Sequence, residues 1–117
     1  MGCDEDQTVV LDQHHSQMVY LNLIPEDWQR EEIKIRKSPF FIGKNGEKAD
    51  AVICEEDISR LHAKIVVEDD GVFVIDQEST NGTYVNGKRL VPWERRKVLA
   101  DDKIAFSSVY YRVETGS

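Results

Sequence analysis

The stretch Asp76-Gln-Glu-Ser-Thr-Asn-Gly-Thr-Tyr-Val-Asn-Gly-Lys-Arg-Leu90 joins a polar loop to the clearest hairpin signal in the chain. Asn86-Gly87 separates two short runs, residues 83–85 and 88–90. An Asn-Gly pair readily adopts the left-handed backbone angles of a two-residue hairpin turn. Small and amide residues fill the loop before the first run. The stretch therefore predicts a loop that leads into a β-hairpin.

Short alternating runs of the same kind continue on both sides. Asp69-Asp70-Gly71 predicts a second tight turn, between strands at residues 62–68 and 72–75. No window has a convincing helical period. Many short strands with turn residues between them predict an all-β sandwich or barrel. The other expected strands are residues 18–24, 32–36, 39–43, 97–99, 103–106 and 110–113.

The chain divides into an N-terminal tail and one domain. Its 117 residues allow a single hydrophobic core. Residues 1–16 carry the cluster Asp4-Glu5-Asp6 and predict an acidic, flexible tail, whereas residues 17–117 carry the strand pattern. His14-His15 in the tail is expected to be exposed to solvent, since no further Cys or His cluster accompanies it. We expect no metal and no cofactor.

Charge and composition exclude several classes of function. The formal net charge is -7, from 22 acidic and 15 basic residues. So negative a surface disfavours nucleic acid and direct contact with anionic membranes. No signal peptide and no membrane-spanning stretch is evident, and the two cysteines, Cys3 and Cys54, are expected to be reduced thiols. We therefore expect a cytoplasmic protein, or a cytoplasmic domain of a larger one.

Three polar loops, at residues 43–48, 57–62 and 76–83, contain the side chains that a phosphate monoester needs. Such a group carries between one and two negative charges and three acceptor oxygens, and it requires cations, hydroxyls and amide donors. The candidates are the cations Lys44 and Arg60, the hydroxyls Ser59 and Thr80, and the amide of Asn81.

The order of these loops resembles the forkhead-associated domain. The matching runs are Gly43-Lys44, Ser59-Arg60-Leu61-His62 and the long motif at residues 76–87, and Leu99-Ala-Asp-Asp-Lys-Ile104 is similar to the family's ending. The resemblance covers residues 18–114. It implies a two-sheet β-sandwich of about eleven strands. It also implies a non-catalytic signalling adaptor that binds phosphothreonine peptides in Ser/Thr kinase pathways.

The resemblance also assigns roles to residues of this sequence. Lys44, Ser59, Thr80 and Asn81 match the family positions that contact phosphate or peptide backbone, and Arg60 is an auxiliary contact. Gly43, His62 and Gly82 match positions that maintain the loop architecture. The family usually has Arg where this chain has Lys44, and an ammonium lacks the bidentate grip of a guanidinium. The alternative is therefore a phosphate-independent interaction domain with a degenerate pocket.

Two further hypotheses concern a reactive serine and the tail. Ser59 and His62 could suggest a hydrolase, but no nucleophile elbow or oxyanion-hole motif accompanies them, so we expect no enzyme activity. Thr8 follows acidic residues and has Leu11 three positions later. Both features resemble phosphorylated tails of bacterial family members. We therefore regard Thr8 as a possible phosphosite whose phosphorylated segment docks in the loops, the alternative being an inert acidic tail.

Overall fold

The computed structural model describes residues 8–10 and 19–115, and these residues form strands, turns and loops without a helix. None of them belongs to a helix that could span a membrane. The strands are β1 (Thr8–Val10), β2 (Leu21–Pro25), β3 (Ile33–Ile35), β4 (Phe40–Gly43), β5 (Ala51–Ile53), β6 (Ala63–Glu68), β7 (Gly71–Asp76), β8 (Thr83–Val85), β9 (Lys88–Arg89), β10 (Arg95–Val98), β11 (Lys103–Phe106) and β12 (Val109–Thr115).

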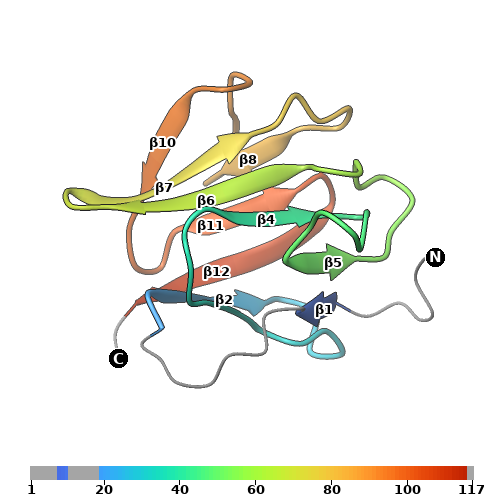
Figure 1. The fold of residues 1–117 in the computed structure, drawn as a ribbon, viewed down its shortest axis with the longest axis horizontal. Coiled ribbons are helices and arrows are strands. Elements are labelled where there is room, and N and C mark those ends of the chain that lie inside the picture. Colours follow the sequence, from blue (N-terminus) through green and yellow to red (C-terminus); the bar gives the residue numbers. More distant parts are fainter. Residues whose placement is uncertain (1–7, 11–18, 116–117) are drawn as a thin grey trace.

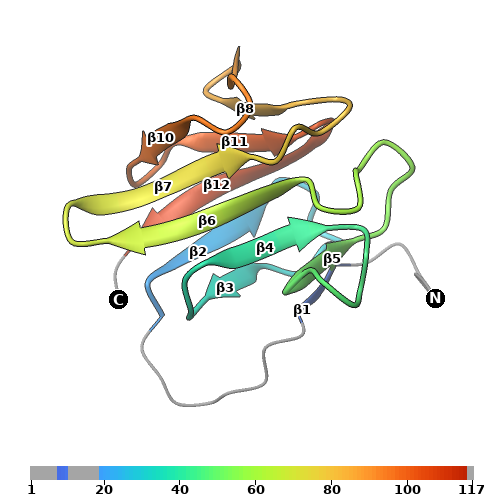
Figure 2. The same cartoon turned by 45° about the horizontal axis from the view of Figure 1, so that its top comes forward.

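These strands build two six-stranded sheets. One sheet has the order β1-β5-β4-β6-β7-β10 and the other β3-β2-β12-β11-β8-β9. In Figures 1 and 2 the sheet with β4, β6 and β7 lies in front of the sheet with β2, β11 and β12. The two-sheet all-β sandwich expected from the sequence is confirmed.

Both predicted hairpin turns are present. β6 and β7 pair from Glu68↔Gly71 onward, and Gly71 has a φ of 144°. β8 and β9 pair across Asn86 and Gly87, whose φ angles are 52° and 85°. Positive φ is costly for most side chains but not for Gly, and only mildly so for Asn. Turn chemistry thus fixed the register of both hairpins.

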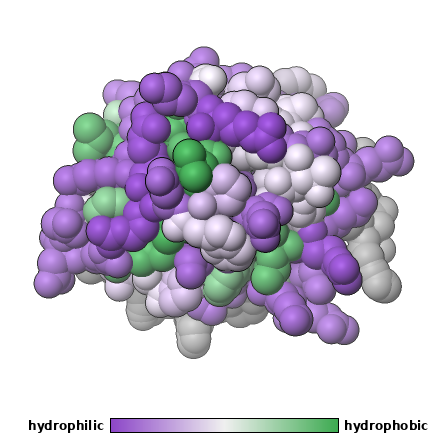
Figure 3. Space-filling view, turned by 90° about the horizontal axis from the view of Figure 1, so that it is seen from above, coloured by the Kyte–Doolittle hydropathy of each residue, from purple (hydrophilic) through white to green (hydrophobic). Residues whose placement is uncertain are grey.

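The core lies between the two sheets because alternate residues of each strand point inward. In β4, for example, Phe40 and Ile42 are fully buried, whereas Phe41 between them is partly exposed. Tyr111, Phe40 and Phe106 are the largest side chains without solvent exposure. Seen from the β8–β10 side, the surface is mostly hydrophilic with hydrophobic side chains in separate patches (Figure 3).

Two short strands were not predicted. β5 pairs in parallel with β4, and its residues are all buried, so it shows no polar–apolar alternation. β1 pairs antiparallel with β5 and lies inside the segment expected to be a flexible tail. The rest of that tail, including His14, His15 and Cys3, lies outside the described residues.

The expectation of reduced thiols is wrong for Cys54, which follows β5 and is disulfide-bonded. A disulfide depends on how close two Cα atoms come in space, and two isolated cysteines in a sequence do not reveal that distance.

Candidate functional site

Three loops meet at one end of the sandwich. They are residues 44–50 between β4 and β5, residues 54–62 between β5 and β6, and residues 77–82 between β7 and β8. All three lie at the right-hand end of the molecule in Figures 1 and 2. The turn between β11 and β12, residues 107–108, joins them through hydrogen bonds. Apart from the possible phosphosite Thr8, which begins β1, the site residues suggested by the sequence lie in or beside these loops.

The first two loops are joined by their backbones. The amide of Lys44 donates to the carbonyls of both Ser59 and Arg60, each at 3.0 Å. Gly43 permits this contact, because a Cβ at that position would lie 2.0 Å from the carbonyl oxygen of Arg60. A glycine is required here by close approach of two backbones rather than by an unusual φ.

His62 fastens the second loop to the third from inside. Its side chain is fully buried; Nδ1 accepts from the amide of Ser59 at 3.0 Å, and Nε2 donates to the carbonyl of Gly82 at 2.8 Å. Burial lowers the pKa of His62, so the ring stays neutral in the tautomer that these two bonds require. Both ring nitrogens are therefore engaged with backbone groups, and neither is available as a base for the Ser59 hydroxyl.

Two further contacts bind the second loop to the third near the surface. The hydroxyl of Ser59 accepts from the amide of Thr80 at 3.0 Å. The side-chain amide of Asn81 donates to the carbonyl of Asp57 at 2.9 Å. Ser59, Thr80 and Asn81 thus lie together although Ser59 is more than twenty residues away in sequence.

The third loop is held in shape by a buried carboxylate. Asp76 is 2% exposed and accepts from the hydroxyls of Ser79 and Thr83, both at 2.6 Å, and from the amide of Ser79 at 3.1 Å. The Ser79 hydroxyl in turn accepts from the amide of Gly82, which has a φ of 94°. This network curls the chain so that Thr80 and Asn81 form an exposed tip.

A second carboxylate holds the loops against the β11–β12 turn. Asp57 accepts from the hydroxyls of Ser107 at 2.6 Å and Ser108 at 2.7 Å. These two bonds, that from Ser107 being the stronger influence, lower the pKa of Asp57. The carbonyl of Gly82 also accepts from the amide of Ser107, so the turn contacts two of the three loops.

These contacts leave several polar groups of the loop tips available to a ligand. Among the described residues, the side chains of Lys44 and Arg60 make no ion pair or hydrogen bond. The Ser59 hydroxyl accepts one bond and keeps its own hydrogen to donate. Thr80 uses its backbone and keeps its hydroxyl. The cluster therefore offers two cations and two hydroxyl donors to an anion.

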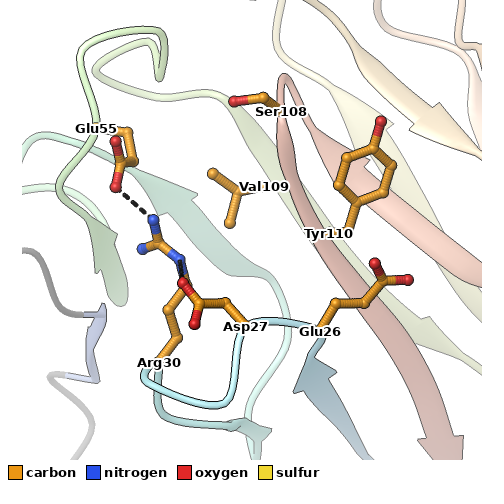
Figure 4. Close-up of a pocket in the computed structure, with 7 residues that line it drawn as sticks. All are labelled: Glu26, Asp27, Arg30, Glu55, Ser108, Val109 and Tyr110. Carbon is orange, nitrogen blue, oxygen red and sulfur yellow. Dashed lines mark hydrogen bonds and ion pairs between the residues drawn. The ribbon is translucent and has the colours of Figure 1, made fainter.

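An acidic hollow lies beside the same loops. It has a volume of about 340 Å³ and contains the carboxylates of Glu26, Asp27 and Glu55. Arg30 extends between Asp27 and Glu55 and forms ion pairs with both (Figure 4). Among the described residues, no group of three or more His, Cys, Asp or Glu side chains is arranged to hold a metal ion.

Several residues that shape the site were not singled out from the sequence. Asp76, Ser79 and Thr83 lie within the long motif but received no role, although an Asp three residues before a Ser is a common turn-forming pattern. Ser107 and Ser108 gave no signal, since their contact with Asp57 spans some fifty residues. Arg89 is a further cation near the third loop, where it donates to the carbonyl of Thr80 at 3.4 Å.

Comparison with protein families and curated proteins gives matches over much of the chain. The FHA domain family model matches residues 40–107. Protein FraH of Nostoc sp. (strain PCC 7120) is 40% identical over 50 residues, which cover 43% of this chain and 17% of FraH. The human nuclear inhibitor of protein phosphatase 1 is 28% identical over 93 residues, covering 77% of this chain and 26% of the inhibitor. The chain thus spans about a quarter or less of the length of these curated relatives.

Solved structures share the fold. Mycobacterium tuberculosis EmbR in complex with a low-affinity phosphopeptide superposes with a TM-score of 0.76 at 20% identity, covering 86% of this chain and 26% of EmbR. The N-terminal domain of S. cerevisiae Rad53p, in complex with a phosphothreonine peptide, superposes with a TM-score of 0.72 at 18% identity, covering 85% of this chain and 94% of that structure.

Proposed function

Because this chain belongs to the FHA domain family, we propose that it binds phosphothreonine peptides and acts as a non-catalytic adaptor in Ser/Thr kinase signalling. The solved structures of EmbR and the Rad53p domain contain phosphorylated peptides and share the sandwich. The proposed contacts are Lys44, Ser59, Arg60, Thr80 and Asn81, with Gly43, His62 and Gly82 supporting the loops.

One observation carries the proposal: the candidate side chains come from three loops that are bonded to one another through backbone groups. The bonds from Lys44 to Ser59 and from Thr80 to Ser59 use amides, a carbonyl and one hydroxyl lone pair. The ammonium of Lys44 and the hydrogen of the Ser59 hydroxyl stay free for a ligand. Loops that are already bonded to one another lose less backbone freedom when they bind an anion than separate mobile loops would.

Local charge opposes the overall charge at this site. The whole chain carries -7, which repels a phosphopeptide at long range. Lys44 and Arg60 lack carboxylate partners among the described residues, so their charge is available at contact distance. Because an ammonium does not form the bidentate contact of a guanidinium, Lys44→Arg is expected to raise affinity by up to about tenfold.

Titration of a phosphothreonine peptide and its unphosphorylated twin tests the proposal. We expect measurable binding of the phosphorylated peptide alone. Ser59→Ala and Asn81→Ala should each weaken binding by about 1–3 kcal/mol, because a hydrogen bond to a charged ligand is lost in each. Glu47→Ala, at an exposed position of the first loop, is the matched control and should bind as the parent does. Equal affinity for both peptides would establish the phosphate-independent alternative instead.

A phosphorylated Thr8 segment is proposed as an internal ligand of the same site. The backbone of Thr8 pairs with Ile53 in the β1–β5 ladder, so docking in the loops of its own chain requires β1 to leave β5. Protein phosphorylated at Thr8 should bind an external phosphopeptide more weakly than unmodified protein does. Equal affinities, with Thr8→Ala as the control that cannot be phosphorylated, would exclude this autoinhibition.

A further inference from the structure

A row of outward side chains crosses the sheet that contains β8, β11 and β12. Ala105 pairs directly with Tyr84 on one side and with Tyr110 on the other. Its neighbours Ile104 and Phe106 are fully buried, so alternation along β11 directs Ala105 to the outer face. Two tyrosines therefore flank an alanine on three adjacent strands, and Ala105 is nevertheless only 4% exposed.

This row forms a slot with a small floor and two aromatic walls. A cavity of about 690 Å³ lies above it and is lined by all three residues. Neighbouring strands are about 4.8 Å apart, so the two tyrosines rise from backbones roughly 9–10 Å apart. A flat group needs about 3.5–4 Å of contact distance on each side. The slot thus has the width for one planar or slender apolar side chain between the two rings.

One wall is held by two contacts, and the other is about half exposed to solvent. The hydroxyl of Tyr84 donates to the carbonyl of Asn81 at 3.3 Å, and Arg89 stacks over its ring at 6.0 Å. Tyr110 is 48% exposed. Its ring also borders the acidic hollow, where Figure 4 shows it beside Glu26 and Ser108. Tyr110 therefore separates the apolar slot from the acidic hollow.

The slot is continuous with the loop cluster. Asn81, Ser107 and Ser108 line the same cavity, and these are the residues through which the third loop and the β11–β12 turn contact Asp57. A peptide held at Asn81 therefore has the slot directly beside it. The occupant that this continuity favours is a flanking residue of the bound peptide itself.

We propose that the slot over Ala105 receives one aromatic or proline side chain of the phosphopeptide, so that Tyr84 and Tyr110 determine sequence preference; this inference rests on the proposed function. The phosphate group holds the peptide at the loops. The slot then selects the peptide side chain that lies at the distance of the slot before or after the phosphothreonine. The walls are aromatic, and stacked aromatic and proline groups gain contact on both faces.

The test is a set of peptides with one fixed phosphothreonine in an alanine background, in which a single Trp or Pro is moved through the flanking positions. We expect one position at which Trp or Pro raises affinity about tenfold over alanine. Tyr110→Ala removes one wall and Ala105→Leu fills the slot, so each should abolish that gain while the all-alanine phosphopeptide binds as before. Tyr20→Ala removes a tyrosine of similar exposure, 42%, elsewhere on the surface and should keep the gain.

The outcomes separate this inference from the function on which it rests. Phosphate-dependent binding of the alanine peptide without any preferred position would overturn the slot alone. A preference that survives both Tyr110→Ala and Ala105→Leu would also overturn it. If no phosphorylated peptide binds better than its unphosphorylated twin, the proposed function and the slot both fail.

Discussion

Replacing His62 by alanine tests whether one buried ring holds the recognition loops together. The change leaves the amide of Ser59 and the carbonyl of Gly82 without the partners they have at 3.0 and 2.8 Å. The Gly82 carbonyl keeps its bond from the amide of Ser107, so the Ser59 amide alone is orphaned, at a cost of about 1–3 kcal/mol. The edge-on contact with Phe106, at 6.1 Å between centroids, contributes about 0.5–1.5 kcal/mol more. The expected loss in the free energy of unfolding is about 3 kcal/mol, a substantial part of the roughly 5–15 kcal/mol that stabilises a domain of this kind.

Urea denaturation followed by far-ultraviolet circular dichroism measures this loss. Tryptophan fluorescence is a weaker probe here, because Trp28 and Trp93 are 85% and 56% exposed in the folded state. Ser59→Ala is the control, because it keeps the backbone amide that donates to His62. It should lower the free energy of unfolding by about 1 kcal/mol or less. A His62→Ala variant that is destabilised no more than Ser59→Ala, or that binds phosphopeptide normally, would refute the argument that the ring joins the loops.

Three other perturbations probe the same framework. Because burial lowers the pKa of His62 below its ordinary 6.5, the unfolded chain takes up a proton that the folded chain excludes. Stability and phosphopeptide affinity should therefore fall as the pH drops below about 6.5. Thermal unfolding from pH 8 to pH 5 should show the fall in stability. Gly43→Ala places a Cβ 2.0 Å from a backbone oxygen of Arg60 and should lower the free energy of unfolding, measured by urea denaturation, by about 2–4 kcal/mol. An unchanged free energy of unfolding would disprove the close approach. Asp76→Asn keeps the shape of the side chain but sets an NH2 group against one of the three groups that donate to Asp76. It should therefore lower the free energy of unfolding by about 1–3 kcal/mol in the same assay and weaken phosphopeptide binding. Full affinity would show that the buried carboxylate does not shape the third loop.

The sequence predicts the hairpins and the general position of the loops, because both depend on local chemistry. Asn86-Gly87 produced the turn that its backbone preferences indicate, whereas in Asp69-Asp70-Gly71 the positive φ is at Gly71, the first residue of β7. β5 escaped prediction because it is buried on both faces and pairs in parallel with β4, which leaves no alternation to detect. The disulfide of Cys54 escaped for a related reason, since it depends on spatial proximity alone.

For the site, the sequence indicates which residue types could hold a phosphate but not how the loops are fixed. The family resemblance gave Ser59 and Thr80 as contacts to phosphate or peptide backbone, and the structure adds that the amide of Thr80 donates to the hydroxyl of Ser59. The contacts of Asp57 with Ser107 and Ser108 join residues about fifty positions apart, and no local pattern encodes such a pairing. The slot over Ala105 likewise follows only from the register of three strands.

The way the loops are bonded has a consequence for how specificity can evolve. Lys44 is held by its backbone amide, and Thr80 likewise by its amide and carbonyl, so their side chains contribute little to folding. Mutations at these tips can therefore accumulate without a stability threshold to restrain them, whereas Gly43, His62 and Asp76 tolerate few replacements. Such a scaffold can acquire new partners through substitutions at the loop tips. Protein engineers could likewise vary the loop tips while keeping Gly43, His62 and Asp76 unchanged.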